Sequence, residues 1–183
     1  MTQFYLDFET SGIDPQKDKI ISIQYQMLDF KTAAPRGPLV ILKEWESSEK
    51  EILKEFIEVL NPSDNWDFVP IGYNIKFELY FLQKRLKKVL KYELSDDWLY
   101  YEMPRIDIKD TLILVNEGKF KGTTLDWFIG KEMDDSQVPE LYAQKNYAAI
   151  EDYVTEEAVR FLHVYQFFKR KLPKLYDDYE PLP

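Results

Sequence analysis

The sequence predicts one α/β domain in which three strands come before a crossover helix and a fourth strand. Residues 2–8 form an apolar, strand-like run, and residues 19–28 alternate between apolar and polar side chains. Apolar residues then recur at helical spacing up to residue 60, and residues 68–72 form a short buried run. A strand that follows a helical crossover pairs parallel to the first strand. We therefore expect a mixed sheet, an antiparallel three-strand meander plus parallel strands, flanked by helices.

The order of the elements follows from local signals. The alternation at residues 19–28 indicates an antiparallel partner and one wetter face. Two prolines and a glycine at residues 33–38 indicate a turn into a third strand at residues 39–43. Ser47 or Ser48 can cap the helix that follows, and Asn61-Pro62 ends it.

The second half of the chain is predicted to be mostly helical. A helix starts near Phe77 and carries an apolar stripe to Leu90, and residues 105–108 form a brief strand before a helix at residues 109–115 that Asp107 caps. Thr123 or Thr124 can cap a short helix ending at Gly130, followed by a polar, acidic segment at residues 131–137. The last long helix covers about residues 146–172. We expect a single domain over residues 1–172 and an irregular tail over residues 173–183.

The composition limits the residue types that could carry out catalysis or bind a metal. There are no cysteines and only one histidine, His163, so acid-base or metal chemistry must depend on carboxylates and tyrosines. The net charge of −9 argues against non-specific adhesion to nucleic acid over the whole surface, but bound cations would cancel part of it. No apolar run is long enough to span a bilayer, and the N-terminus lacks a signal sequence. We expect a cytoplasmic protein without a membrane partner.

Two carboxylates interrupt the first strand. Asp7 and Glu9 are two residues apart, so in a strand both project from one face. Anions that close repel each other unless a cation or a proton lies between them, which makes the pair a candidate metal site. The alternative is that the strand ends at Leu6 and both acids are solvated turn residues.

Two later stretches also carry acids at helix positions. Glu78 lies in the first turn of a helix just after a strand, where Asn74 could cap and the helix dipole alone could favour an acid. Tyr153 and Glu157 are one helical turn apart and border the apolar face of the last helix. The alternative is that Tyr153 is a core residue and Glu157 a surface acid.

Together these stretches resemble the DnaQ-like 3′-5′ exonucleases, the DEDD superfamily with a ribonuclease H-like fold. The segment Asp7-Phe8-Glu9-Thr10 is similar to the first exonuclease motif, and Gly72-Tyr73-Asn74 with Phe77-Glu78 is similar to the second. Tyr153 and Glu157 resemble the tyrosine (DEDDy) form of the third motif, as in the proofreading domains of family B DNA polymerases. A second frame for the third motif places Glu151 and Asp152 beside Tyr147.

The resemblance implies a two-metal nuclease with Mg²⁺ or Mn²⁺. It implies that Asp7 bridges both ions, that Glu9 and Glu157 complete one ion site, and that Glu78 holds the second ion. Tyr153 would orient the attacking water. Thr10 and Asn74 would steady the terminal nucleotide, and Phe77 would stack on a base.

The resulting hypothesis is a 3′-5′ exonuclease that acts on single-stranded ends, DNA in preference to RNA, in proofreading, repair or recycling. Glutamate replaces the usual aspartate at positions 78 and 157, which moves each carboxylate outward by about 1 to 1.5 Å, a shift large on the scale of catalytic geometry. The alternatives are therefore an inactive nucleic-acid or protein binding module on the same fold, and an exoribonuclease that trims RNA 3′ ends.

Overall fold

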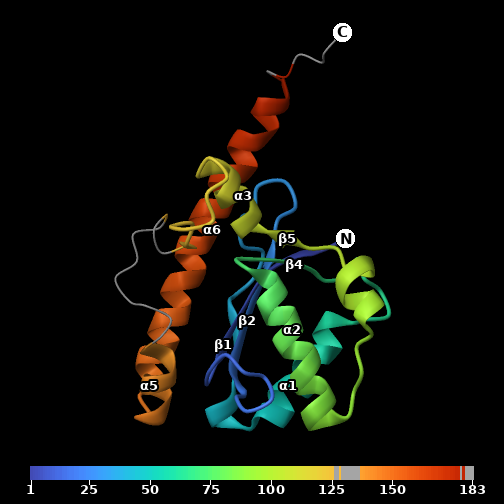
Figure 1. The fold of residues 1–183 in the computed structure, drawn as a ribbon, viewed down its shortest axis with the longest axis vertical. Helices are drawn as coiled ribbons and strands as arrows, with labels where there is room; N and C mark the ends of the chain where they lie inside the picture. Colours follow the sequence, from blue (N-terminus) through green and yellow to red (C-terminus); the bar gives the residue numbers. More distant parts are fainter. Residues whose placement is uncertain (126–127, 129–136, 178, 180–183) are drawn as a thin grey trace.

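A five-stranded sheet flanked by helices forms the core of the structure, a computed structural model that describes residues 1–125, 128, 137–177 and 179 (Figure 1). The strands are β1 (Gln3–Thr10), β2 (Ile20–Leu28), β3 (Val40–Lys43), β4 (Val69–Gly72) and β5 (Ile106–Asp107). The α-helices are α1 (Glu49–Leu60), α2 (Ile75–Arg85), α3 (Ile108–Val115), α5 (Val138–Ala143) and α6 (Tyr147–Asp177). Short helical turns are η1 (Glu44–Glu46), η2 (Leu86–Leu90) and η3 (Trp98–Glu102).

The order of strands in the sheet is β3-β2-β1-β4-β5. The pairs β1–β2 and β2–β3 are antiparallel, whereas β4 pairs parallel with β1 and β5 pairs parallel with β4. This arrangement confirms the predicted mixed sheet. Gly72 ends β4 where a Cβ atom would lie 2.6 Å from the carbonyl oxygen of Leu6, so the close approach of β4 to β1 requires a glycine.

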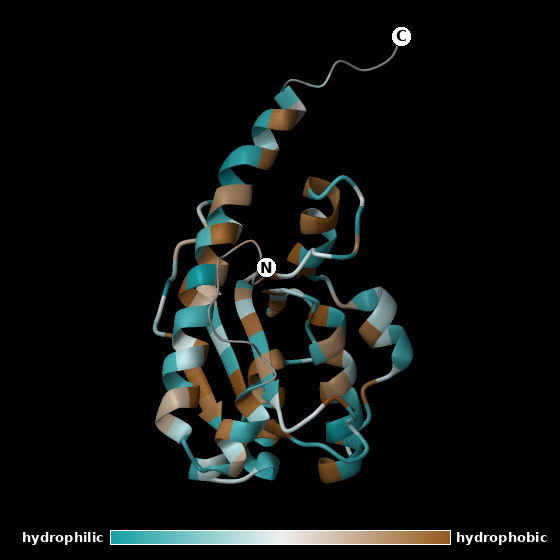
Figure 2. Ribbon diagram, turned by 60° about the vertical axis from the view of Figure 1, so that its left-hand side comes forward, coloured by the Kyte–Doolittle hydropathy of each residue, from teal (hydrophilic) through white to brown (hydrophobic). Residues whose placement is uncertain are grey.

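The two faces of the sheet pack against different helices. Helices α1 and α2 lie on one side and α6 runs along the other (Figure 1). On β1, Phe4, Leu6 and Phe8 enter the core shared with α1 and α2, and Tyr5 packs instead with Phe161 of α6. Hydrophobic and hydrophilic bands alternate along α6, as a helix with only one buried face requires (Figure 2).

The start of α1 decides between the two predicted caps. The hydroxyl of Ser48 accepts a hydrogen bond from the Glu51 amide at 3.2 Å, whereas the Ser47 hydroxyl donates to the Lys43 carbonyl at 3.4 Å. We expect Ser48→Ala to lower the free energy of unfolding by about 1 kcal/mol, because an N-cap loses its acceptor. Urea unfolding measures this loss. Ser47→Ala is the matched control, and an equal loss in both variants would contradict the assignment.

The C-terminal boundary differs from the prediction. Helix α6 does not end at residue 172 but continues through Pro173 to Asp177. A proline inside a helix removes one backbone hydrogen bond. Leu172 and Pro173 border a small cavity together with Ile108 and Thr111 of α3. The irregular tail predicted from residue 173 therefore does not begin at that residue, because the helix continues to Asp177.

Two other predictions concern segments that lie largely outside the residues that the structure describes. The helix expected after Thr123 or Thr124 and the acidic segment at residues 131–137 fall largely on residues 126–127 and 129–136, outside the described residues. Within the described part of the chain, no helix combines the length and the apolar character that crossing a membrane requires. The division into a domain over residues 1–172 and a tail stays a prediction.

Candidate metal centre

The first two acids lie within β1. The strand continues to Thr10, so the alternative interpretation of Asp7 and Glu9 as solvated turn residues is wrong. The two carboxylates share the face of the sheet that packs against α6, and only 7% of Glu9 is exposed. Across the antiparallel pair, Asp7 lies opposite Gln24 and Glu9 lies opposite Ser22, and both of these partners are fully buried.

Helix α6 brings the third acid to this pair. One carboxylate oxygen from each of Asp7, Glu9 and Glu157 lies within 4.8 Å of the other two. Glu157 is 9% exposed, although it borders the apolar face of α6 and could have been a surface acid. The extra methylene of glutamate therefore does not keep this carboxylate from reaching the two acids on β1.

The fourth acid, Glu78, comes from the first turn of α2. It lines the same cavity of about 420 Å³ as Asp7, Glu9 and Glu157. Only 6% of Glu78 is exposed, and within the described residues its Oε2 atom has no hydrogen-bond partner. Burial, and then the charge of Asp7, raise the pKa of the Glu78 carboxyl well above its usual value.

These properties suit hard divalent cations. Mg²⁺ and Mn²⁺ prefer oxygen ligands, and the four residues supply carboxylate oxygens. A bound cation would favour the charged form of Glu78, and the Oε2 atom of Glu78 could then bind this cation as a ligand. Complementing a helix dipole would not require this burial, because an acid can do so from an exposed position. The residues present therefore fit a metal centre that draws ligands from β1, α2 and α6.

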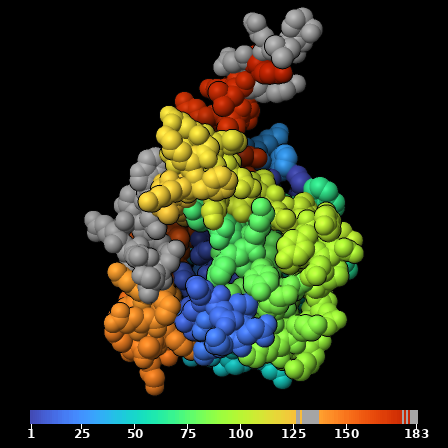
Figure 3. Space-filling model, in the orientation of Figure 1, coloured from blue at the N-terminus to red at the C-terminus, as the bar shows by residue number. Residues whose placement is uncertain are grey.

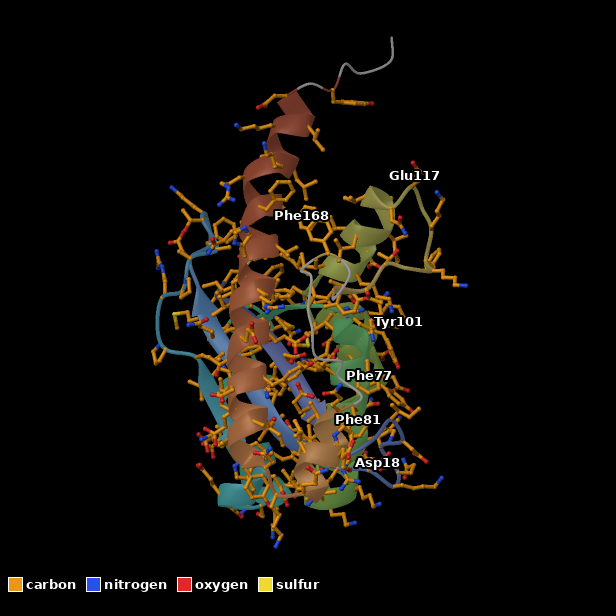
Figure 4. The ribbon with its side chains drawn as sticks, turned by 90° about the vertical axis from the view of Figure 1, so that its left-hand side faces the viewer. Asp18, Phe77, Phe81, Tyr101, Glu117 and Phe168 are labelled. Atoms are coloured by element: carbon orange, nitrogen blue, oxygen red, sulfur yellow. The ribbon has the colours of Figure 1, made fainter. Side chains whose placement is uncertain are left out.

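The predicted substrate residues line the same cavity, whose floor on β1 is visible beside α2 (Figure 3). The Thr10 hydroxyl donates to the carbonyl oxygen of Gly12 at 2.7 Å, and the side-chain oxygen of Asn74 accepts from Lys109 at 2.9 Å. Phe77 projects from α2, above the loop that carries Asp18 (Figure 4). Seven of the eight predicted site residues thus gather at one cavity.

The eighth residue, Tyr153, is not among the described residues that line this cavity. It is 4% exposed and packs in a cluster with Ile21, Val138, Ile150 and Val154. Its predicted role in orienting water stays a prediction. The second frame for the third motif gains no support. The carboxylate of Glu151 forms an ion pair with the Nζ atom of Lys43 at 2.8 Å, and Asp152 is exposed. Neither residue is among the described residues that line the cavity.

Sequence reasoning missed Tyr5, which also lines the cavity. Burial, and then the charges of Asp7, Glu157, Glu9 and Glu78, raise the pKa of its phenol well above the usual value. Tyr5 lies two residues before Asp7 on β1, so the period-two rule already places both side chains on one face. That spacing could have identified it.

The fold and the site define a class: a ribonuclease H-like α/β domain with a buried carboxylate pocket. Among solved structures, the chain is similar to Escherichia coli Exonuclease I in complex with a dT13 oligonucleotide, with a TM-score of 0.59 and 13% identity over 96% of this chain and 42% of the other. The product-bound Exonuclease I structure gives the same TM-score and identity, and the match covers 45% of its chain.

This likeness concerns the fold, and the chain spans less than half the length of those Exonuclease I chains. No protein-family model matches the sequence, and no curated protein does either.

Proposed function

We propose that this protein is a 3′-5′ exonuclease of the DnaQ-like superfamily that uses two divalent ions, Mg²⁺ or Mn²⁺, to hydrolyse phosphodiester bonds at single-stranded 3′ ends, with DNA preferred over RNA. One observation carries the proposal: Asp7, Glu9 and Glu157 converge within 4.8 Å, and Glu78 faces the same cavity. The sequence motifs and the fold shared with Exonuclease I, whose structures include complexes with single-stranded DNA, support it.

Phosphodiester hydrolysis matches what this site offers. Two divalent ions about 3.5 to 4 Å apart supply an activated water and relieve negative charge on the attacked phosphate and the leaving oxygen. In this proposal Asp7 is a ligand of both ions, Glu9 and Glu157 complete one ion site, and Glu78 serves the other. Glu9, Glu78 and Glu157 are buried, and buried charges are costly unless they are paired or bind metal ions.

The remaining residues would hold the substrate. Phe77 and Asn74 stand at the start of α2 beside the cavity, where an aromatic ring can stack on a terminal base of any sequence. Thr10 closes the turn that brings Gly12 to the cavity. A Cβ atom at Gly12 would lie 2.4 Å from a carboxylate oxygen of Asp18, so a larger residue there would displace the Asp18 side chain. In this proposal Tyr153 orients the attacking water from α6.

The test is digestion of end-labelled oligonucleotides with and without Mg²⁺ or Mn²⁺. We expect stepwise shortening from the 3′ end of single-stranded DNA only when a divalent ion is present. Matched RNA strands separate this activity from an RNA-trimming enzyme, and labels at either end establish the polarity. Substrate that stays intact with both metals would contradict the proposal and favour a binding module.

Metal binding is tested without substrate. We expect saturating Mn²⁺ to raise the melting temperature, because a ligand that binds only the folded state stabilises it. At a concentration about 100 times the Kd the gain is about 2.7 kcal/mol, which corresponds to about 5 to 10 °C for a chain of this size. Differential scanning calorimetry with EDTA as the reference measures the shift.

Two neighbouring glutamates on α6 provide the control. Glu157→Gln is expected to lose most of the Mn²⁺ shift because it removes a ligand. Glu156→Gln should keep it, because Glu156 is exposed and pairs with Arg160. Equal shifts in both variants would show that Mn²⁺ binds outside this cluster.

A further inference from the structure

One polar group inside the cavity has no role in the mechanism above: the phenol of Tyr5. The residue is 2% exposed, and its hydroxyl has no hydrogen-bond partner among the residues that the structure describes. It nevertheless lines the cavity that holds the four acids. Its ring packs against Phe161 of α6 at a centroid distance of 5.0 Å, so the side chain is fixed at the junction of β1 and α6.

A buried hydroxyl without a partner is costly. Leaving such a group unsatisfied costs about 1 to 3 kcal/mol, and phenylalanine would fill nearly the same space without that cost. Tyr165, in the same core cluster, has a partner, since its hydroxyl lies 3.4 Å from the side-chain oxygen of Gln3. The phenol of Tyr5 therefore calls for an acceptor other than those that the described residues provide.

The residues around Tyr5 indicate the chemistry of that acceptor. Tyr5, Asp7 and Glu9 follow each other at every second position of β1, and all four acids act on the Tyr5 phenol electrostatically. The four acids, once charged, can only accept hydrogen bonds. A neutral phenol is a hydrogen-bond donor that adds no further negative charge to this group.

We propose that Tyr5 is a positioning residue of the metal centre, whose hydroxyl donates a hydrogen bond to an oxygen in the cavity when the four acids hold divalent ions. This inference rests on the proposed function. Groups that hydrogen-bond to metal ligands fix their orientation, and losing one typically weakens metal binding about 10- to 100-fold. Tyr5 would thus orient the carboxylate ligands of the metal ions, and packing against Phe161 would fix the position of the Tyr5 ring.

A structural role is the competing explanation. Gln24, on the neighbouring strand β2, is also fully buried, and its side-chain oxygen has no partner within the described residues. A water molecule joining Tyr5 to Gln24 would satisfy both groups and would stabilise the protein without metal. The two explanations predict opposite effects of removing the hydroxyl on the metal-free protein.

The experiment compares Tyr5→Phe with Tyr165→Phe in the full chain. Isothermal titration with Mn²⁺ and thermal unfolding in EDTA are measured on both variants and on the wild type. For Tyr5→Phe we expect Mn²⁺ affinity to fall about 10-fold, with a metal-free melting temperature equal to or above that of the wild type. For Tyr165→Phe we expect unchanged Mn²⁺ affinity and a lower melting temperature, because a hydrogen bond is lost.

Turnover provides a second readout. With saturating Mn²⁺, Tyr5→Phe should lower kcat and leave KM for a single-stranded oligonucleotide unchanged, because the phenol acts on the metal ligands and not on the nucleic acid. A Tyr5→Phe protein that binds Mn²⁺ as tightly as the wild type, or that melts lower without metal, overturns the role of Tyr5 alone. A wild-type protein that does not bind Mn²⁺ overturns the proposed function as well.

Discussion

Replacing Asp7 with asparagine is expected to reduce exonuclease turnover by about 10³-fold or more, because one side chain would serve both ions and its loss removes charge stabilisation from the transition state. Asparagine keeps the shape of the side chain but removes the negative charge. The metal-free protein should remain folded and at least as stable as the wild type, since the substitution relieves repulsion among neighbouring acids. Initial rates on a 3′-accessible oligonucleotide, with circular dichroism of the same samples, measure both effects.

Asp152→Asn is the matched control for this experiment. Asp152 is an exposed acid on α6, five residues before Glu157, and it belongs to the second frame of the third motif. We expect its substitution to change turnover less than about twofold, since exposed groups remote from the site seldom matter. Retained turnover in Asp7→Asn would disprove the metal mechanism. A large loss in Asp152→Asn would instead revive the second frame.

The largest effect on stability is expected at Arg85. Its guanidinium binds both carboxylate oxygens of Glu49 at 2.7 and 2.6 Å and donates to the carbonyl of Pro15 at 3.1 Å. Glu49 in turn accepts a hydrogen bond from the Ile20 amide at 2.9 Å. This buried pair joins α1 and α2 to the start of β2 and to the loop after β1, which also carries Gly12 of the cavity.

We expect Arg85→Ala to lower the free energy of unfolding by about 3 to 5 kcal/mol, because it leaves a charged carboxylate buried without a partner. Urea unfolding measures the loss. The double variant Arg85→Met with Glu49→Leu should lose clearly less, since both charges are then removed together. Lys54→Ala, which breaks an exposed pair with Glu51, is the control and should cost at most about 1 kcal/mol. Equal losses at Arg85 and Lys54 would contradict this account.

Much of the fold could be predicted because local patterns and short connections determine it. The antiparallel pairing of β2, the Ser48 cap, the Asp107 cap and the parallel pairing of β4 with β1 are all found in the structure. The wetter face expected for β2 is wrong for its first half, where Ser22 and Gln24 are fully buried because helix α6 covers that face of the sheet. The predicted end of the last helix near residue 172 is wrong, because whether a helix continues past a proline depends on its tertiary surroundings. In the structure, residues of α3, which is distant in sequence, line a cavity beside this part of α6.

Part of the candidate site could likewise be predicted from the sequence, and part of it could not. The sequence by itself determined that Asp7 and Glu9 share one face, because side chains in a strand alternate with a period of two. Only the tertiary structure decided that Glu78 and Glu157 join them and that Tyr153 is not among the described residues that line the cavity. A residue at the border of an apolar helix face can turn toward the core or toward solvent. The docking of α2 and α6 on the sheet decides which of these two orientations each residue takes, and this docking depends on the whole core.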